Sequence, residues 1–337
     1  MKKNIVLFLA FALLMPVVSY AASISGAETT LGASKETPRF FSLKRLAIGV
    51  DNDWVFNRDL KVSSYAKYLD TTSLINLGGV NFPIRQISYT SIDNTYTKPK
   101  IDRMYLTTAK ISYALFKNLD IFIKLGRANL KLKDESFTGR VNDLINYTQF
   151  GVAITPAMPI DNGNIDYDID NSFVWGVGFK ATYDLPKNWS VGMDAQYLRH
   201  KHDYDASSSI MFFGGGVGFG EDYETYSGTL TIYEWQIAPY IAKKIKNFTP
   251  YLGFKYSDLR IKDHSQVGFK YLFFSAPFVT PQVDVGSGNY TIKKYRTEDN
   301  FGPFVGLDYN ITKNLKLNIE GRFVDETAMS CNISYKF

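Results

Sequence analysis

Apolar and polar residues alternate with a period of two along much of the chain, most clearly near its C-terminus. Between Leu315 and Phe323 the odd positions are apolar or Gly, and the even positions are Lys316, Asn318, Glu320 and Arg322. After a turn at residues 325–327, the alternation resumes from Met329 to Phe337. Because successive side chains of a strand point to opposite faces, this pattern predicts a hairpin with one apolar and one polar face.

The same alternation recurs upstream and predicts about ten strands. They cover residues 46–50, 105–115, 121–125, 173–183, 189–197, 233–241, 250–256, 303–309, 315–323 and 329–337. We therefore expect an all-β fold without long helices.

The connections between these strands alternate in length. Short turns carry the Lys-Asn pairs that begin at Lys117, Lys187, Lys246 and Lys313. The long connections cover residues 57–100, 134–170, 204–225 and 263–298. An even strand number with short turns on one side is typical of a transmembrane, antiparallel up-and-down β-barrel with short periplasmic turns and long extracellular loops. The strands of a secreted β-sandwich also alternate apolar and polar residues. Such a fold does not require all short connections at one end and all long ones at the other.

The N-terminus predicts export. Lys2 and Lys3 precede an apolar run from Ile5 to Val18, and small residues follow near Ala21. This is typical of a secretory signal peptide over residues 1–21. We assign residues 22–42 to an N-terminal periplasmic segment and 43–337 to an outer-membrane barrel. Beyond the leader, no stretch approaches the ~18 apolar residues of a spanning helix.

Composition supports the barrel. Aromatic residues make up 15% of the chain, and the single Cys excludes an internal disulfide framework. Aromatic residues near strand ends favour girdles at the two membrane interfaces. The formal charge of +5 is too small a bias to indicate a nucleic-acid partner. We assign no cofactor.

The polar faces of the strands, taken as inward, carry charges of both signs. The candidate lumen charges are Lys110, Lys124, Lys180, Lys255, Lys316, Arg322, Asp194, Glu234, Asp308 and Glu320. One interpretation is structural: the charges pair across a narrow, filled lumen, because buried charge needs a partner. The other is a narrow polar pore, favoured by glycines on the same wall, such as Gly192 and Gly306, which leave space.

The repeated strand, Lys-Asn turn, strand units and the final Ile333-Ser334-Tyr335-Lys336-Phe337 resemble the OmpA-like, opacity-type outer-membrane barrels. In that superfamily the aromatic C-terminal strand is read by the barrel assembly machinery. The resemblance implies an assembly signal at Ile333, Tyr335 and Phe337. Residues 249–257 and the last strands also resemble the end of the chlamydial major outer-membrane porin.

An enzyme is a further alternative, because ten-stranded barrels include the omptin proteases, which use an Asp pair facing an Asp-His pair at the extracellular rim. Candidates here are Asp51 and Asp53 with His200, His202 and Asp203, or with Asp263 and His264. Asp263 and His264 are adjacent, so they would point to opposite faces. We assign no catalytic, cofactor-binding or metal residue.

The expected function is therefore that of a non-enzymatic outer-membrane protein with a structural or adhesin-like surface role. A small porin is the first alternative and an omptin-like protease the second. Beyond membrane lipid and the assembly machinery, an extracellular partner could bind through the four long connections. Ile210 to Phe213 and Phe269 to Val279 are apolar for loops, which favours either such contacts or strands that continue above the bilayer.

Overall fold

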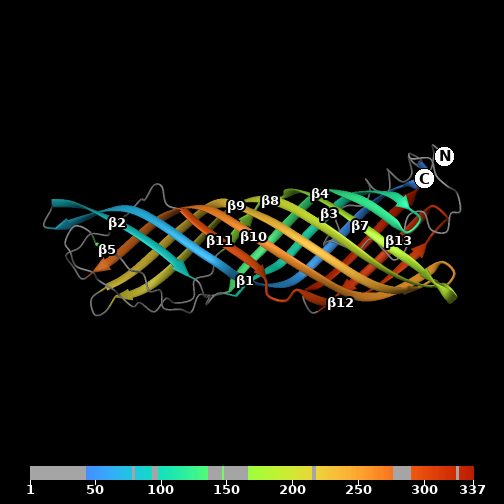
Figure 1. Ribbon diagram of the computed structural model, residues 1–337. Helices are drawn as coiled ribbons and strands as arrows, with labels where there is room; N and C mark the ends of the chain where they lie inside the picture. Colours follow the sequence, from blue (N-terminus) through green and yellow to red (C-terminus); the bar gives the residue numbers. More distant parts are fainter. Residues whose placement is uncertain are drawn as a thin grey trace.

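The computed structural model describes residues 43–77, 80–92, 98–135, 146–147, 166–214, 218–275, 290–323 and 326–337. Within these ranges one antiparallel sheet closes on itself as an elongated barrel (Figure 1). The predicted signal peptide and periplasmic segment, residues 1–42, lie outside the described residues.

Two short 3-10 turns and fourteen strand segments make up the described chain. They are η1 (Leu43–Arg45), β1 (Leu46–Leu77), β2 (Val80–Ile92), β3 (Lys98–Phe116), β4 (Leu119–Glu135), β5 (Asn146–Tyr147), β6 (Asp166–Ile169), β7 (Ser172–Leu185), η2 (Pro186–Asn188), β8 (Trp189–Gly214), β9 (Gly218–Lys243), β10 (Phe248–Ser275), β11 (Tyr290–Thr297), β12 (Phe301–Asn310), β13 (Leu315–Arg322) and β14 (Thr327–Lys336).

Ten strands form the closed ring, in the order β14-β13-β12-β10-β9-β8-β7-β4-β3-β1, with β14 pairing back onto β1. The seam runs from Ala47 opposite Lys336 to Asn57 opposite Thr327. The Phe337 N–H donates to Leu46 O at 3.2 Å and completes it. The predicted up-and-down barrel of about ten strands is confirmed. Closure gives hydrogen-bond partners to the backbone groups of both edge strands, which hydrocarbon could not provide.

The Lys-Asn turns lie at one end of the barrel, together with the C-terminus (Figure 1). In the turn between β7 and β8, Lys187 and Asn188 both have positive φ, 60° and 62°. Two consecutive left-handed residues give a tight hairpin connection whose twist matches that of the strands, and Asn tolerates this conformation well. By the rule for outer-membrane barrels this end faces the periplasm.

At the other end the strands continue much further than the sequence predicted. β8 and β9 remain paired out to Gly214 opposite Gly218, and β10 continues to Ser275. β1 runs to Leu77 and forms a hairpin with β2. The expected loops at 57–100, 204–225 and 263–298 are therefore in large part strand. Each strand continues after the apolar positions leave its outer face because its neighbour still supplies backbone partners. Most of 134–170, and 276–289, lie outside the described residues.

The closing hairpin contributes two strands to the periplasmic part of the barrel only. On the periplasmic side of its turn, which we call the lower side, β13 and β14 lie between β12 and β1. Above it, β11 pairs directly with β10 on one side and with β1 on the other. The barrel wall therefore loses two strands at the level of the hairpin turn.

The two faces of the wall exchange character near that level. On β10 the exposed side chains are first apolar and then polar: Leu252, Phe254 and Tyr256, followed by Arg260, Lys262 and His264. Its buried side chains change in the opposite sense: Lys255 and Ser257, followed by Leu259 and Ile261. β8 repeats the change, since exposed Met193 gives way to Lys201, and buried Asp194 to Leu198. The outer surface of the lower, periplasmic part is therefore suited to contact lipid. The outer surface of the upper, extracellular part is suited to contact water.

An apolar core fills the upper part. It is formed by side chains that point inward from nearly every long strand, including Leu106, Leu130, Leu198, Leu230, Ile232 and Leu259. The lower lumen has only a small apolar cluster, around Tyr240, Tyr251 and Phe304. Among the described residues, no helix is both long and apolar enough to cross a membrane.

A matched pair of lysine substitutions tests this boundary. Val177→Lys places a charge on the exposed apolar face of β7 and should lower the free energy of unfolding by about 2–4 kcal/mol. Ser227→Lys, on the exposed polar face of β9, should change it little. Urea titration of the refolded barrel in lipid vesicles measures both. Equal costs at the two positions would contradict the assignment.

Candidate functional site

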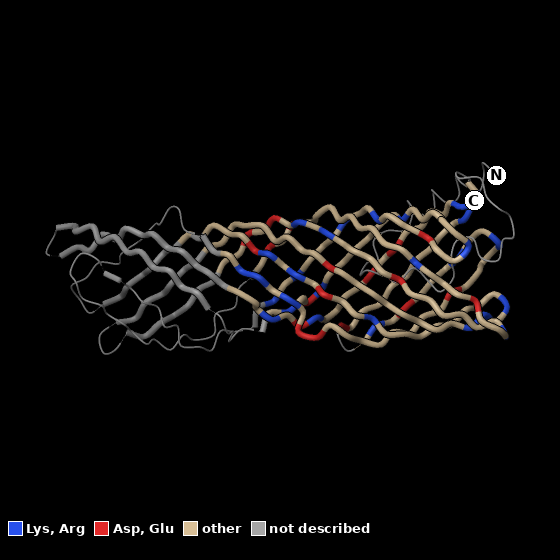
Figure 2. The backbone as a smooth tube through the Cα atoms, viewed as in Figure 1, with Lys and Arg blue, Asp and Glu red and all other residues tan. Residues whose placement is uncertain are grey.

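The lower lumen brings the predicted charges together. Nine of the ten candidate lumen residues have side chains almost completely buried inside the barrel: Lys110, Lys124, Lys180, Lys255, Arg322, Asp194, Glu234, Asp308 and Glu320. Lys316 is also on the inner wall, with 18% of its side chain exposed. Because their strands turn apolar side chains to the outside, these charged side chains point into the barrel. Figure 2 marks the positions of both signs along the strands.

The densest group, which we call the ion-pair layer, consists of Asp53, Arg58, Glu234, Lys255, Arg322 and Glu326. Arg58 Nη1 lies 2.5 Å from Glu234 Oε1 and 3.2 Å from Glu326 Oε2. Lys255 Nζ also pairs with Glu326, and Arg322 Nε lies 3.3 Å from Glu326 Oε1. Ser257 Oγ donates to Glu234 at 2.8 Å. Five strands or turns are thus joined across the lumen where the wall loses its two strands.

Further pairs lie below this layer. Lys124 Nζ is 2.7 Å from Asp51 Oδ2, and the Asn332 amide also donates to Asp51. Lys316 Nζ is 3.4 Å from Asp308 Oδ2. Asn318 Nδ2 lies 2.8 Å from the other oxygen of Asp308. Such pairs offset the desolvation of each charge, as expected for a narrow lumen.

Two members of the ion-pair layer were missed from the sequence. Arg58 lies in a segment that we expected to be a loop, and Glu326 in the turn of the closing hairpin. A register shift between Val55 and Asn57 inserts one residue, so Val55 and Arg58 both point inward although three positions separate them. Assigning every second residue of the strand to the inner face would have placed Arg58 outside, because the bulge shifts the alternation by one residue.

Space left by glycines on the inner wall is occupied by aromatic rings. A Cβ at Gly192 would lie 2.3 Å from the Tyr240 ring, and one at Gly306 would lie 2.2 Å from the Tyr251 ring. Tyr240 and Tyr251 are themselves in contact, with ring centroids 6.0 Å apart. These glycines therefore admit large inward side chains, and the space they leave is not free lumen.

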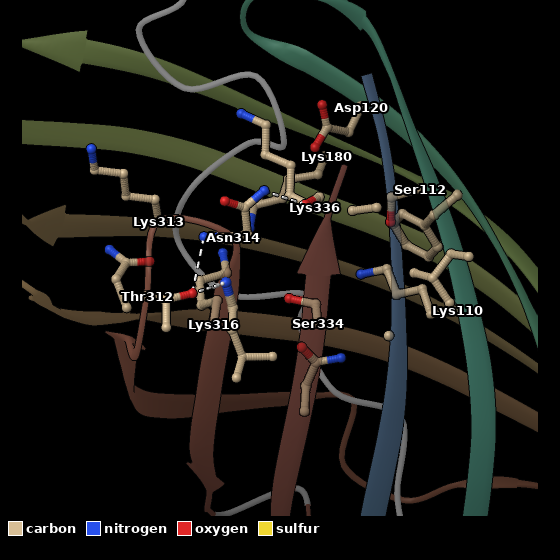
Figure 3. Close-up of a pocket in the computed structure, with 17 residues that line it drawn as sticks. Lys110, Ser112, Asp120, Lys180, Thr312, Lys313, Asn314, Lys316, Ser334 and Lys336 are labelled. Atoms are coloured by element: carbon tan, nitrogen blue, oxygen red, sulfur yellow. Dashed lines mark hydrogen bonds between the residues drawn. The ribbon is translucent and has the colours of Figure 1, made fainter. Parts of the chain in front are cut away.

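A cavity of about 150 Å³ remains at the periplasmic mouth (Figure 3). Its lining reaches the rim turn at residues 312–314. The charged side chains that line it are five lysines and one carboxylate: Lys110, Lys180, Lys313, Lys316, Lys336 and Asp120. The Lys110 Nζ also lies 4.2 Å from the centre of the Phe122 ring. We call this cavity the basic vestibule.

The residues considered for an omptin-like site do not meet at the rim. Asp51 and Asp53 are buried in the lower lumen against Lys124 and Arg322. His200 and His202 are buried and joined by a 2.7 Å hydrogen bond between ring nitrogens. The described ranges hold no group of three or more His, Cys, Asp or Glu suited to a metal ion.

The second Asp-His candidate is split across the wall, as expected for adjacent residues. His264 is exposed on the outside, whereas Asp263 is buried inside and accepts a 2.7 Å hydrogen bond from the Tyr204 hydroxyl. Both groups belong to the polar-walled extracellular part, and burial raises the pKa of the Asp263 carboxyl above its ordinary value. This carboxyl is part of the packed interior.

Removing the shared acceptor of the ion-pair layer tests its importance. Glu326→Ala leaves three buried cations, Arg58, Lys255 and Arg322, without their common partner. The expected loss is about 3–5 kcal/mol of unfolding free energy, because an uncompensated charge stays buried. Loss of the heat-resistant folded band on electrophoresis, together with urea titration, measures it.

Lys201→Ala is the matched control. Its pair with Asp203 is long, at 3.9 Å, and both side chains are mostly exposed. Exposed pairs contribute little, so this variant should have the same unfolding free energy and heat-resistant band as the wild type. An equally small effect of Glu326→Ala would show that the layer does not hold the barrel together.

Comparisons with known proteins found similar chains by sequence and by structure. The chain is 21% identical to the major outer membrane porin, serovar F, of Chlamydia trachomatis, over 87% of this chain and 85% of the relative. It is 23% identical to the major outer membrane porin of Chlamydia psittaci, over 62% and 59%. Among solved structures, the outer membrane protease OmpT of Escherichia coli matches with a TM-score of 0.38 and 11% identity, over 86% of this chain and 97% of that one.

The family described as Chlamydia major outer membrane protein matches residues 41–211, upstream of the segments in which the sequence resembled that porin. Relatives of this kind and the barrel geometry place the protein in the outer membrane. Since the match covers about half of its length, the chain belongs to the Chlamydia major outer membrane protein family.

Proposed function

We propose that this protein is a small porin that passes ions or small solutes through a narrow polar lumen. The observation that carries the proposal is the inner wall of the membrane-spanning part, which is lined by charges of both signs and opens into the basic vestibule. The names of the relatives, major outer membrane porins, support it.

The basic vestibule favours anions. Five lysines and one carboxylate line it, so its electrostatic potential is positive where a solute enters from the periplasm. Rings of basic side chains select anions in pores by the same attraction. We therefore expect a current carried more by chloride than by potassium.

The described conformation is closed above the vestibule. The ion-pair layer crosses the lumen, and the apolar core fills it from there upward. Conduction through the porin thus requires these inward side chains to part. We expect brief and infrequent openings rather than the steady current of a wide porin.

The packed upper barrel also favours a second candidate, a structural or surface-interaction role. Strands β8, β9 and β10 run 26, 26 and 28 residues, much longer than the ~9–11 residues that cross a membrane. A barrel whose strands run this far holds its extracellular end away from the bilayer. In this role the tips of the strands would meet the extracellular partner.

Planar-bilayer recording distinguishes the two candidates. The porin should give small, salt-dependent current steps in the wild type. Leu230→Ala with Leu259→Ala removes side chains from the apolar core and should make the steps longer or larger. Thr231→Ala with Tyr233→Ala changes the outer wall at the same level and should leave them unchanged.

A silent wild type at several voltages, recorded with folded protein, would overturn the porin proposal. If the Leu230→Ala, Leu259→Ala variant then conducts, the native core blocks the lumen and the structural role is favoured. Steps of equal size in the core and outer-wall variants would show that current does not follow the lumen.

The closing strand remains our proposed assembly signal. Ile333, Tyr335 and Phe337 are half-buried at the seam, and the rings of Tyr335 and Phe337 meet at 5.3 Å between centroids. Deletion of Phe337 removes the last ring of this edge. We expect much less folded barrel in the outer membrane, measured by heat-modifiable mobility of membrane fractions.

Phe323→Ala is the control, because Phe323 is an exposed apolar residue at the opposite end of the same hairpin. It should insert normally. Equal insertion of the Phe337 deletion and the wild type would remove the support for an assembly signal.

A further inference from the structure

Two rows of basic residues cross the wall of the barrel just above its apolar belt, where blue segments of the tube gather in Figure 2. In the first row, Arg260 lies opposite Arg296, and Arg296 lies opposite Lys61. In the second row, Lys262 lies opposite Lys294. Arg199 and Lys201 of β8 extend the two rows across β9, through Tyr233 and Thr231.

We call these seven side chains, all exposed, the exterior basic patch: Lys61, Arg199, Lys201, Arg260, Lys262, Lys294 and Arg296. Carboxylates offset it in part. Asp258 binds Arg260 through two hydrogen bonds, of 2.6 and 2.9 Å, and Asp203 lies 3.9 Å from Lys201. Asp59 and Glu298 lie within two residues of Lys61 and Arg296. The surface therefore keeps a net positive charge.

Like charges face each other directly in this patch. Arg260 and Arg296, Lys61 and Arg296, and Lys262 and Lys294 are cross-strand partners, an arrangement that destabilises a sheet unless anions lie between them. Within the described chain, no ion pair joins Lys61, Lys262, Lys294 or Arg296 to a carboxylate. Arg199 and Lys262 instead lie 5.4 Å from the Tyr233 ring.

The patch is continuous with the membrane interface. Outward aromatic residues lie directly below it on β8, β10 and the adjacent strands β9 and β12, including Tyr197, Tyr256, Trp235 and Phe301. Tyr197 and Trp235 are in ring contact at 4.9 Å. Aromatic residues in this position mark the headgroup level of the outer leaflet. The basic side chains thus lie at the height of lipid phosphates, where the outer wall leaves the hydrocarbon and meets water.

We propose that the exterior basic patch binds the phosphate groups of the glycolipid in the outer leaflet of the outer membrane. Basic residues directly opposite each other, such as Arg260 and Arg296, have Cβ atoms about 5 Å apart, so one phosphate can contact both side chains. Guanidinium groups bind phosphate through two parallel hydrogen bonds, and ammonium groups bind it as point charges. Bound phosphates would neutralise the three facing like-charge pairs. The inference rests on outer-membrane location and strand direction, and it is independent of conduction.

Titration of the folded full-length protein with lipid A tests the proposal. Fluorescent bisphosphorylated lipid A in non-ionic micelles should bind and raise anisotropy. The variant K61Q/K262Q/K294Q/R296Q should need about tenfold more lipid A for half-saturation, because each lost cation weakens attraction to an anionic surface. Its heat-resistant electrophoretic band confirms that it remains folded.

The control variant K117Q/K187Q/K244Q/K246Q removes the same number of exposed charges at the periplasmic end and should bind lipid A as the wild type does. Dephosphorylated lipid A, phosphatidylglycerol and inorganic phosphate should each bind or compete far more weakly. Equal weakening of both variants, or an unchanged affinity in the patch variant, would overturn the proposal. So would phosphatidylglycerol or dephosphorylated lipid A binding as tightly as the bisphosphorylated form.

Discussion

Charged side chains that share a strand with lipid-facing residues must find their partners inside the barrel. Hydrocarbon covers the outer wall, so each inward charge below the ion-pair layer depends on an opposite charge or an amide from another strand. Lys124 with Asp51, and Arg58 with Glu326, meet this need between segments far apart in sequence. Glu326 with Arg58 and Lys255, and Arg322 with Asp53, join the closing hairpin to β1 and β10.

The exchange of polarity between the two faces follows from the same constraint. Once the outer wall leaves lipid, its side chains become polar, and the inner face can be filled by apolar residues as in a soluble barrel. The ion-pair layer lies at this junction, where the β13–β14 hairpin ends and β11 closes on β1. One continuous sheet therefore contains a polar lumen below and an apolar core above.

Alternation and turn chemistry were sufficient to predict the barrel and its ten strands, because a strand half-buried in lipid must alternate and Lys-Asn suits a left-handed turn. The lengths of β8, β9 and β10 were not predictable in this way, since backbone pairing continues without an apolar outer face. The inward orientation of Lys180 and Glu234 could be predicted because each alternates with the apolar, lipid-facing residues of its strand. Arg58 is concealed by the bulge near Phe56, and Glu326 by its place in a turn. Which charged residues pair across the lumen depends on the stagger of register around the closed barrel. The alternation within a single strand carries no information about that stagger.

The exchange of wall polarity is tested most directly by spin labels placed at successive positions of β8, from Val191 to Ser207, in a lipid bilayer. Odd positions should be accessible to oxygen up to Tyr197 and to a water-soluble nickel chelate from Lys201 onward. Even positions from Leu198 to Ala206 should be accessible to neither, because their side chains are buried inside the barrel. Oxygen access that persists to Asp205, or nickel access at Leu198 and Tyr204, would contradict the account.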